Sequence, residues 1–266
     1  MTSNNPIVQE VIEKFMTVEK MAAIFSRPEG SNIKGLLISG DAGTGKTFFT
    51  KRGVYQSVND DDIIYIKGAS ITAAALFIKL FLAREKGKIL VLDDVDIIHK
   101  SGQEMNTILD LLKGATEMTK GERILSWERA GANTMMRELE VPMSFNFEGS
   151  VIWITNDKIS EIADKAKGHW NAISSRFNQV PVYLNEQEKL MYTLHLLEEV
   201  DMLGKNCEVV EGGFSREIIQ ETISYIRKNY KFLNEVTPRI AAKIATLMED
   251  FPNEWKMMCD NQLMSY

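Results

Sequence analysis

A glycine-rich loop occupies residues 40–47 and reads Gly40-Asp41-Ala42-Gly43-Thr44-Gly45-Lys46-Thr47. It matches the pattern G-x-x-x-x-G-K-[ST], in which backbone N–H groups surround phosphate oxygens. The apolar run 35–39 before the loop predicts a buried strand, and residues 47–56 after it predict a helix whose N-terminus adds its positive end. Because strand and helix flank the loop in the order that this motif requires, the sequence predicts an ATP site.

Two side chains of the loop have separate predicted roles. Lys46 would reach the β- and γ-phosphates, and the Thr47 hydroxyl would bind Mg²⁺. The expected nucleotide contacts are Gly40, Asp41, Ala42, Gly43, Thr44, Gly45, Lys46, Thr47 and Phe48.

The composition is that of an ordinary globular protein, with 266 residues, 44% apolar and 26% charged. A net charge of -6 argues against a protein that coats nucleic acid through bulk charge, and leaves a local basic patch open. The 2 cysteines, Cys207 and Cys259, lie far apart, so the sequence indicates neither a disulfide framework nor a zinc site. Without a leader pattern or an apolar run of membrane-spanning length, we expect a cytoplasmic protein with no membrane association.

Apolar patterns predict strands that alternate with helices up to about residue 184. The predicted strands are 35–39, 63–66, 88–92 and 151–155, with 181–184 as a further candidate. Helices are predicted at 6–25, 47–56, 71–85, 103–118, 186–201, 215–229, 237–250 and near Glu254. Strands that are almost entirely apolar suit a parallel sheet covered on both faces. The expected fold class is therefore α/β, a parallel sheet flanked by helices and followed by a small all-helical domain.

The change to a purely helical pattern near Leu184 predicts a domain boundary. Residues 1–30 would form an N-terminal helix and linker, 31–184 the α/β nucleotide-binding domain, and 185–266 the helical domain. The segment 114–149 is the hardest to interpret. Its runs 123–127 and 143–147 could pair as a hairpin, which periodicity alone leaves open.

Two aspartates end the apolar strand predicted at 88–92. Phosphoryl transfer needs a carboxylate near the metal at the end of a strand beside the phosphate loop, and Asp93 meets that need. Asp94 follows at a position from which a base could polarise the attacking water. Asp93 is therefore predicted as a Mg²⁺ carboxylate, together with Thr47, and Asp94 as a catalytic residue.

The motifs in this order resemble the AAA+ ATPases, and the resemblance spans residues from about 33 to 248. It implies that Asn156, in Trp153-Ile154-Thr155-Asn156-Asp157, orients the lytic water as sensor 1 does. Arg176, in Ile173-Ser174-Ser175-Arg176-Phe177, is similar to the family's arginine finger, which enters a neighbouring subunit's site. Arg239, at the start of a predicted helix, is similar to the sensor 2 arginine of the family's lid. Arg123, Arg129 and Arg137 are competing candidates for the trans-acting role.

The chain departs from the family pattern at two places. Asp94 stands where many members have glutamate, and its shorter side chain predicts slow hydrolysis. Replication initiators of the family also carry paired aspartates, so the aspartate is compatible with activity. The interval from Asp94 to Asn156 is longer than in a minimal family core, which predicts an insertion at 116–149. Insertions at this place often engage a substrate in that family.

The resemblance implies a Mg²⁺-dependent AAA+ ATPase that forms a homo-oligomeric ring or open helix and remodels or loads a protein partner. The resemblance is strongest to replication initiators, helicase loaders and clamp loaders, so DNA replication or another DNA transaction is the preferred role, with nucleic-acid binding open. A nucleotide-gated scaffold with little hydrolysis is one alternative. A protein-remodelling motor is another, disfavoured because Gly68-Ala69-Ser70 offers no aromatic pore residue.

Overall fold

The computed structural model describes residues 3–27, 32–56, 58–118, 121–128 and 134–265. Residues 28–30 of the predicted linker and Arg129 lie outside these ranges. The chain divides into two compact units. The first comprises Met1–Lys14, Asp41–Gly45 and Tyr183–Tyr266, and the second comprises Phe15–Gly40 and Lys46–Val182.

The second unit is built on a 5-stranded sheet with the strand order β2-β3-β6-β1-β7. The strands are β1 (Gly35–Gly40), β2 (Ile63–Lys67), β3 (Ile89–Asp93), β6 (Ser150–Thr155) and β7 (Phe177–Val182). All neighbouring pairs are parallel. The helices of this unit are α2 (Lys46–Val54), α3 (Ala73–Leu82), α4 (Gly102–Ala115), α5 (Thr134–Glu138), α6 (Ile159–Ala166) and α7 (Trp170–Arg176), together with the later part of α1 (Pro6–Phe25). The predicted parallel α/β fold is confirmed.

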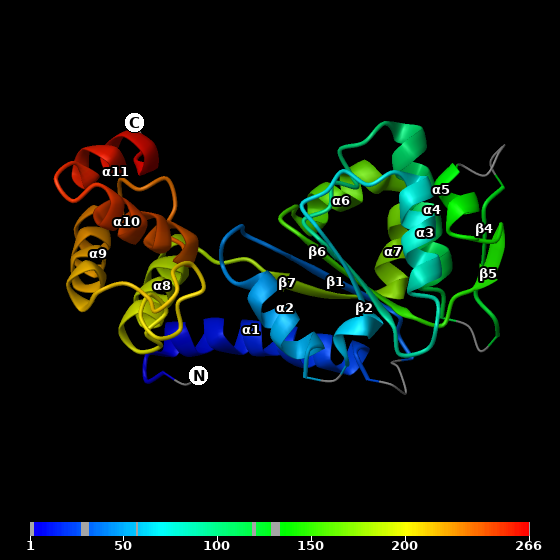
Figure 1. The fold of residues 1–266 in the computed structure, drawn as a ribbon, viewed down its shortest axis with the longest axis horizontal. Helices are drawn as coiled ribbons and strands as arrows, with labels where there is room; N and C mark the ends of the chain where they lie inside the picture. The colour runs from blue at the N-terminus through cyan, green and yellow to red at the C-terminus, as the bar shows by residue number, and fades with distance from the viewer. Residues whose placement is uncertain (1–2, 28–31, 57, 119–120, 129–133, 266) are drawn as a thin grey trace. The chain divides into compact units, whose positions relative to one another are not determined.

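Both faces of the sheet are buried, because successive side chains of a strand point to opposite sides. Leu37, Leu90 and Trp153 belong to a core shared with residues of α3, α4 and α7. Leu36, Ile38 and Ile152 alternate with these residues and are also fully buried. In Figure 1, α3, α4 and α7 stand together on one side of the strands, and α2 lies on the other. This double cover explains why the central strands are apolar throughout.

The segment that periodicity left open forms a hairpin. β4 (Ile124–Ser126) pairs antiparallel with β5 (Ser144–Asn146), with Leu125 opposite Phe145. Phe145 contacts Phe77 and Phe81 of α3, with ring centroids 5.0 Å and 5.3 Å apart. The aromatic contacts attach this small sheet to the α3 side of the main core.

The fifth strand begins earlier than expected. β7 covers Phe177–Val182, so Tyr183 and Leu184 of the predicted strand 181–184 fall outside it. β7 is an edge strand, and its inner residues Asn178 and Gln179 are only half-buried. An edge strand tolerates polar residues and a proline such as Pro181, which donates no ladder hydrogen bond, so its sequence lacks an apolar run.

The C-terminal region is helical, as predicted, and its helices belong to the first unit. They are α8 (Glu186–Glu198), α9 (Arg216–Asn229), α10 (Pro238–Asp250) and α11 (Trp255–Leu263), and they share one apolar core. Ser215 and Thr237 cap α9 and α10, each accepting a backbone N–H bond three residues later. Pro238 occupies the first turn of α10, where a missing N–H costs nothing.

Candidate functional site

The glycine loop connects β1 to α2. Gly43 and Gly45 have φ values of 70° and 118°, a left-handed backbone that residues with a Cβ rarely adopt. The loop ends at Lys46, the first residue of α2, so the N–H groups of the helix's first turn are unpaired within the helix. Loop geometry and helix terminus together suit an anion.

Lys46 is held inside the second unit by two acceptors. Its Nζ donates to the Gly40 carbonyl and to Asn156 Oδ1, both at 2.8 Å, and the residue is 6% exposed. A buried ammonium needs such partners, because burial without them disfavours its charge. The bond to Asn156 crosses from α2 to the end of β6, so two predicted site residues meet directly.

Asn156 also contacts the second aspartate of the pair. Its Nδ2 donates to Asp94 Oδ1 at 2.8 Å, which completes a relay from Lys46 through Asn156 to Asp94. Asp94 has a φ of 55°, and its backbone N–H donates to the Ile154 carbonyl at 2.9 Å. Asp is among the few non-glycine residues that favour this left-handed region. The turn thus directs the Asp94 carboxylate toward Asn156.

The carboxylate of Asp93 is buried, at 2% exposure, and is surrounded by hydroxyl donors. The Thr47 hydroxyl lies 2.9 Å from Oδ1 and 3.0 Å from Oδ2. The Tyr65 hydroxyl of β2 donates to Oδ2 at 2.6 Å. Burial, together with this bond to Asp93, raises the pKa of the Tyr65 phenol, so the phenol stays protonated and remains a donor.

The oxygens of Thr47 and Asp93 suit Mg²⁺, which prefers hard oxygen ligands and is usually held by one or two protein groups plus phosphates. The hydroxyls that reach Asp93 are neutral, so a divalent cation would compensate its buried charge. Among the described residues, no group of three or more His, Cys, Asp or Glu side chains is arranged so that it could hold a metal ion by itself.

Loop residues 41–45 belong to the first unit and contact other residues of that unit. Asp41 Oδ2 accepts a bond from the Leu184 N–H at 2.9 Å and lies 3.3 Å from Lys189 Nζ. A Cβ placed on Gly43 would lie 3.1 Å from Arg239 Cβ and 3.2 Å from Thr237 Oγ1. The first turn of α10, with the exposed Arg239, is therefore packed against the loop at Gly43.

Two further predicted loop residues, Thr44 and Phe48, make contacts within the protein. The Thr44 hydroxyl donates to the Asp41 carbonyl at 2.9 Å, and Thr44 is buried. Phe48, on the first turn of α2, is 39% exposed and makes an edge contact with Phe49.

Arg176 lies at the other end of the sheet. It is the last residue of α7 and precedes β7, whose first residue pairs with Gly35 and whose last pairs with Gly40. Its Nη1 donates to the Ala172 carbonyl at 3.2 Å, and Nη2 lies 3.4 Å from Glu117 Oε1. The 6 residues of β7 cover about 20 Å at the usual rise per residue, which separates Arg176 from Lys46, Asp93 and Asn156.

The competing arginines differ in exposure. Arg123 is buried, at 9% exposure, whereas Arg137 on α5 is exposed. Tyr65 is a residue of the site that the sequence pattern did not reveal. Its signal was its place on the second strand, two residues before the end, but only the pairing of β2 with β3 brings it beside Asp93.

Residues 36–165 match the model of the AAA family, described as the ATPase family associated with various cellular activities. A protein of Enterobacteria phage T4, called "Uncharacterized 36.7 kDa protein in nrdC-mobD intergenic region", is 29% identical over 233 residues. That similarity covers 85% of this chain and 66% of the phage protein.

Two solved structures are also similar at low identity. The Thermotoga maritima RuvB Holliday junction branch migration motor is 13% identical with a TM-score of 0.47, over 93% of this chain and 63% of that chain. NtrX from Brucella abortus in complex with ATP is 14% identical with a TM-score of 0.47, over 96% and 52%. The chain thus spans only part of each of these proteins.

No helix in the described ranges has the length and apolar character needed to span a bilayer.

Proposed function

Because residues 36–165 match the model of the AAA family of ATPases, we propose that this chain binds ATP at residues 40–48 and hydrolyses it with Mg²⁺. The observation that carries this proposal is the relay from Lys46 through Asn156 to Asp94, beside the buried pair of Thr47 and Asp93. Phosphoryl transfer needs a lysine that neutralises phosphate charge, a carboxylate that binds the metal and a second carboxylate that activates the attacking water.

Different residues of the site would bind the phosphates, hold the metal and activate the water. Loop N–H groups and Lys46 bind the phosphates, which requires Lys46 Nζ to exchange its present acceptors for phosphate oxygens. Thr47 and Asp93 would hold Mg²⁺, which supplies charge neutralisation at the phosphates. Asp94 accepts a proton from the attacking water, and Asn156 orients that water once Lys46 has released its amide oxygen.

Two arginines would complete the site. Arg239 lies beside Gly43 at the start of α10, which supports a cis role at the phosphates like that of sensor 2. Arg176 lies at the amino end of β7, whereas Lys46 follows the carboxyl end of the neighbouring strand β1, so we propose that Arg176 serves the site of a second copy. A homo-oligomer, as a ring or open helix, follows from that role.

The biological role that we propose is the remodelling or loading of a partner in DNA replication or another DNA transaction. It is supported by the resemblance of the paired aspartates and of Ser174-Ser175-Arg176 to initiators and loaders. A nucleotide-gated scaffold is the second candidate, favoured by one observation. Asp94 is a methylene shorter than glutamate and sits in a left-handed turn, and both features limit its reach toward a water molecule.

A phosphate-release assay tests the activity. We expect measurable Mg²⁺-dependent release that Asp94→Asn lowers about 10²-fold, the usual contribution of a general base. Asp164→Asn, a change on the exposed side of α6, is the matched control and should leave the rate unchanged. Parallel reactions with single-stranded and duplex DNA at low salt should be faster if the partner is DNA. No release under any condition would favour the scaffold, and no response to nucleic acid would remove the DNA role alone.

Tyr65→Phe should lower turnover about tenfold, because it removes one hydrogen bond to the charged carboxylate of Asp93. Since Tyr65 positions the metal ligand, we also expect a higher Mg²⁺ concentration for half-maximal activity at unchanged ATP affinity. A merely structural residue would not shift the Mg²⁺ dependence. Tyr55→Phe, at a residue 48% exposed, is the control. An unaltered Mg²⁺ titration in Tyr65→Phe would remove this positioning role.

A further inference from the structure

A pocket of about 440 Å³ opens at the amino ends of the parallel strands, within the second unit. Lys34 lies just before β1, Lys86 is in the segment that leads into β3, and Glu148 precedes β6. The phosphate loop and the two aspartates follow the carboxyl ends of these strands. The pocket therefore lies at the sheet edge opposite Lys46 and Asp93, and the proposed hydrolysis does not use it.

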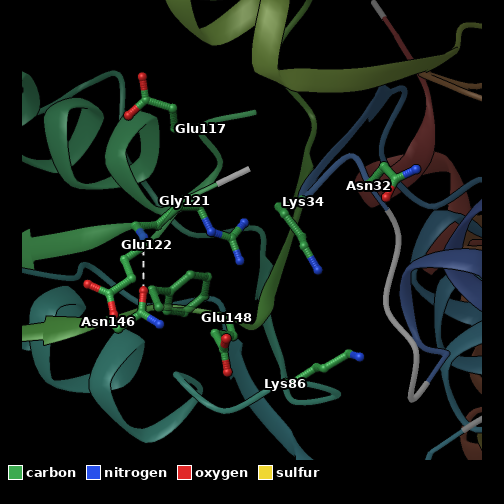
Figure 2. Close-up of a pocket in the computed structure, with 10 residues that line it drawn as sticks. Asn32, Lys34, Lys86, Glu117, Gly121, Glu122, Asn146 and Glu148 are labelled. Atoms are coloured by element: carbon green, nitrogen blue, oxygen red, sulfur yellow. Dashed lines mark hydrogen bonds between the residues drawn. The ribbon is translucent and has the colours of Figure 1, made fainter. Parts of the chain in front are cut away.

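Among the described residues, three basic side chains line this pocket, those of Lys34, Lys86 and Arg123. In Figure 2 the ammonium groups of Lys34 and Lys86 extend toward the same open region, whereas the carboxylates of Glu117 and Glu122 point away from it. Glu117 Oε1 instead lies 3.4 Å from Arg176 Nη2. The two lysines thus face the space, and two of the acidic residues face elsewhere.

Arg123 is an unusual residue for a surface pocket. It is only 9% exposed, and no acceptor in the described part of the chain lies within hydrogen-bond distance of Nη1. Nη2 reaches the Gly149 carbonyl at 3.5 Å, the limit for such a bond, and the guanidinium lies 5.6 Å from the Phe147 ring centre. A buried guanidinium nitrogen without an acceptor is costly. A shift of the guanidinium toward the pocket would let a bound anion supply that acceptor.

The pKa of Lys34 also supports an anion in the pocket. Burial lowers the pKa of Lys34, and the positive charges of Arg123 and Lys86 lower it further, with only Glu148 acting in the other direction. Burial likewise lowers the pKa of Arg123. The cations are therefore close enough to repel one another, and a bound anion would relieve that repulsion.

We propose that this pocket binds a discrete phosphate-bearing anion, with Lys34, Lys86 and Arg123 on the phosphate oxygens. A phosphate group carries nearly two negative charges and three strong acceptor oxygens, which match three converging donors better than one carboxylate does. The volume also falls within the range of small-molecule sites.

A small anion fits better than a nucleic-acid strand. The carboxylates of Glu117, Glu122 and Glu148 also line the pocket, so the formal charges of its acidic and basic residues cancel. A continuous chain of phosphates passing over the opening would meet these carboxylates, whereas one anion can sit among the cations alone.

The test uses the full chain carrying Lys46→Ala. This substitution disables the phosphate loop, which would otherwise bind pyrophosphate itself. Inorganic pyrophosphate is titrated by calorimetry at low ionic strength. We expect saturable binding that Lys34→Gln or Lys86→Gln weakens at least about tenfold, as loss of a charged hydrogen bond implies. Arg123→Gln should do the same. Because Arg123 is buried and its variant could unfold, circular dichroism checks each protein, and the two lysine variants decide the result if it does.

The matched control is Lys228→Gln, which removes one exposed positive charge from α9, outside the pocket. It should leave pyrophosphate binding unchanged. The proposal is overturned if pyrophosphate does not bind, or if it binds equally to all variants. It is also overturned if a single-stranded oligonucleotide binds more tightly with the same dependence on Lys34 and Lys86, because the pocket would then be part of a nucleic-acid surface.

Discussion

Replacing Lys46 by alanine is expected to weaken ATP binding by about 10²–10³-fold, the combined effect of losing charge-assisted hydrogen bonds to two phosphates. The side chain is already buried and directed by Gly40 and Asn156, so little conformational entropy opposes its contact with the nucleotide. Calorimetric titration with ATP and Mg²⁺ measures the affinity.

The matched control for this variant is Lys20→Ala, which removes an exposed lysine of α1. Thermal unfolding should show ATP raising the melting temperature of the wild type and of Lys20→Ala but not of Lys46→Ala, because a ligand stabilises only the state that binds it. Retention of wild-type affinity in Lys46→Ala would contradict the assignment of the loop as the ATP site.

Arg176→Ala is expected to lower turnover by about 10³-fold or more while ATP affinity stays unchanged, as for an arginine that stabilises charge only in the transition state. The physical reason for action on a second copy is the length of β7, which separates Arg176 from Lys46 on the same chain. Phosphate release and calorimetry on the same preparation measure both quantities.

Two comparisons sharpen this prediction. Arg137→Ala, at the exposed competing arginine, should retain activity if Arg176 is the residue that acts. Mixing Arg176→Ala with Lys46→Ala should restore part of the turnover, because one variant offers an intact loop and the other an intact arginine. Loss of affinity with normal turnover, or no recovery on mixing, would argue against a role on a second copy.

Local sequence was sufficient for much of this fold. The helix at 6–25 and the strand before the loop were predicted from apolar patterns, and the structure confirms both. Central strands are buried on both faces, so their composition is distinctive. The edge strand β7 and the short helices α6 and α7 were harder to predict, because half-exposed elements carry polar residues such as Gln179 and Lys165 that leave no clear period.

Some residues of the candidate site could likewise be predicted from local sequence, and others could not. The loop, Asp93, Asp94 and Asn156 follow predicted strands, so the motif order was enough to identify them. Tyr65 and the Arg123 pocket depend on which strands are neighbours and on how the hairpin packs, and those contacts link residues far apart in sequence. The assigned roles of Arg176 and Arg239 and the predicted domain limits, with the insertion at 116–149, stay predictions.

The left-handed backbone at Asp94 also has a consequence for how this position can evolve. Aspartate tolerates that conformation and reaches Asn156 from it, whereas glutamate is less suited to positive φ and would extend past the amide. A single exchange to glutamate would therefore combine strain with a misplaced carboxylate. The shorter acid and the unusual turn depend on each other, so lineages that carry this aspartate can gain the longer acid only by remodelling the turn as well.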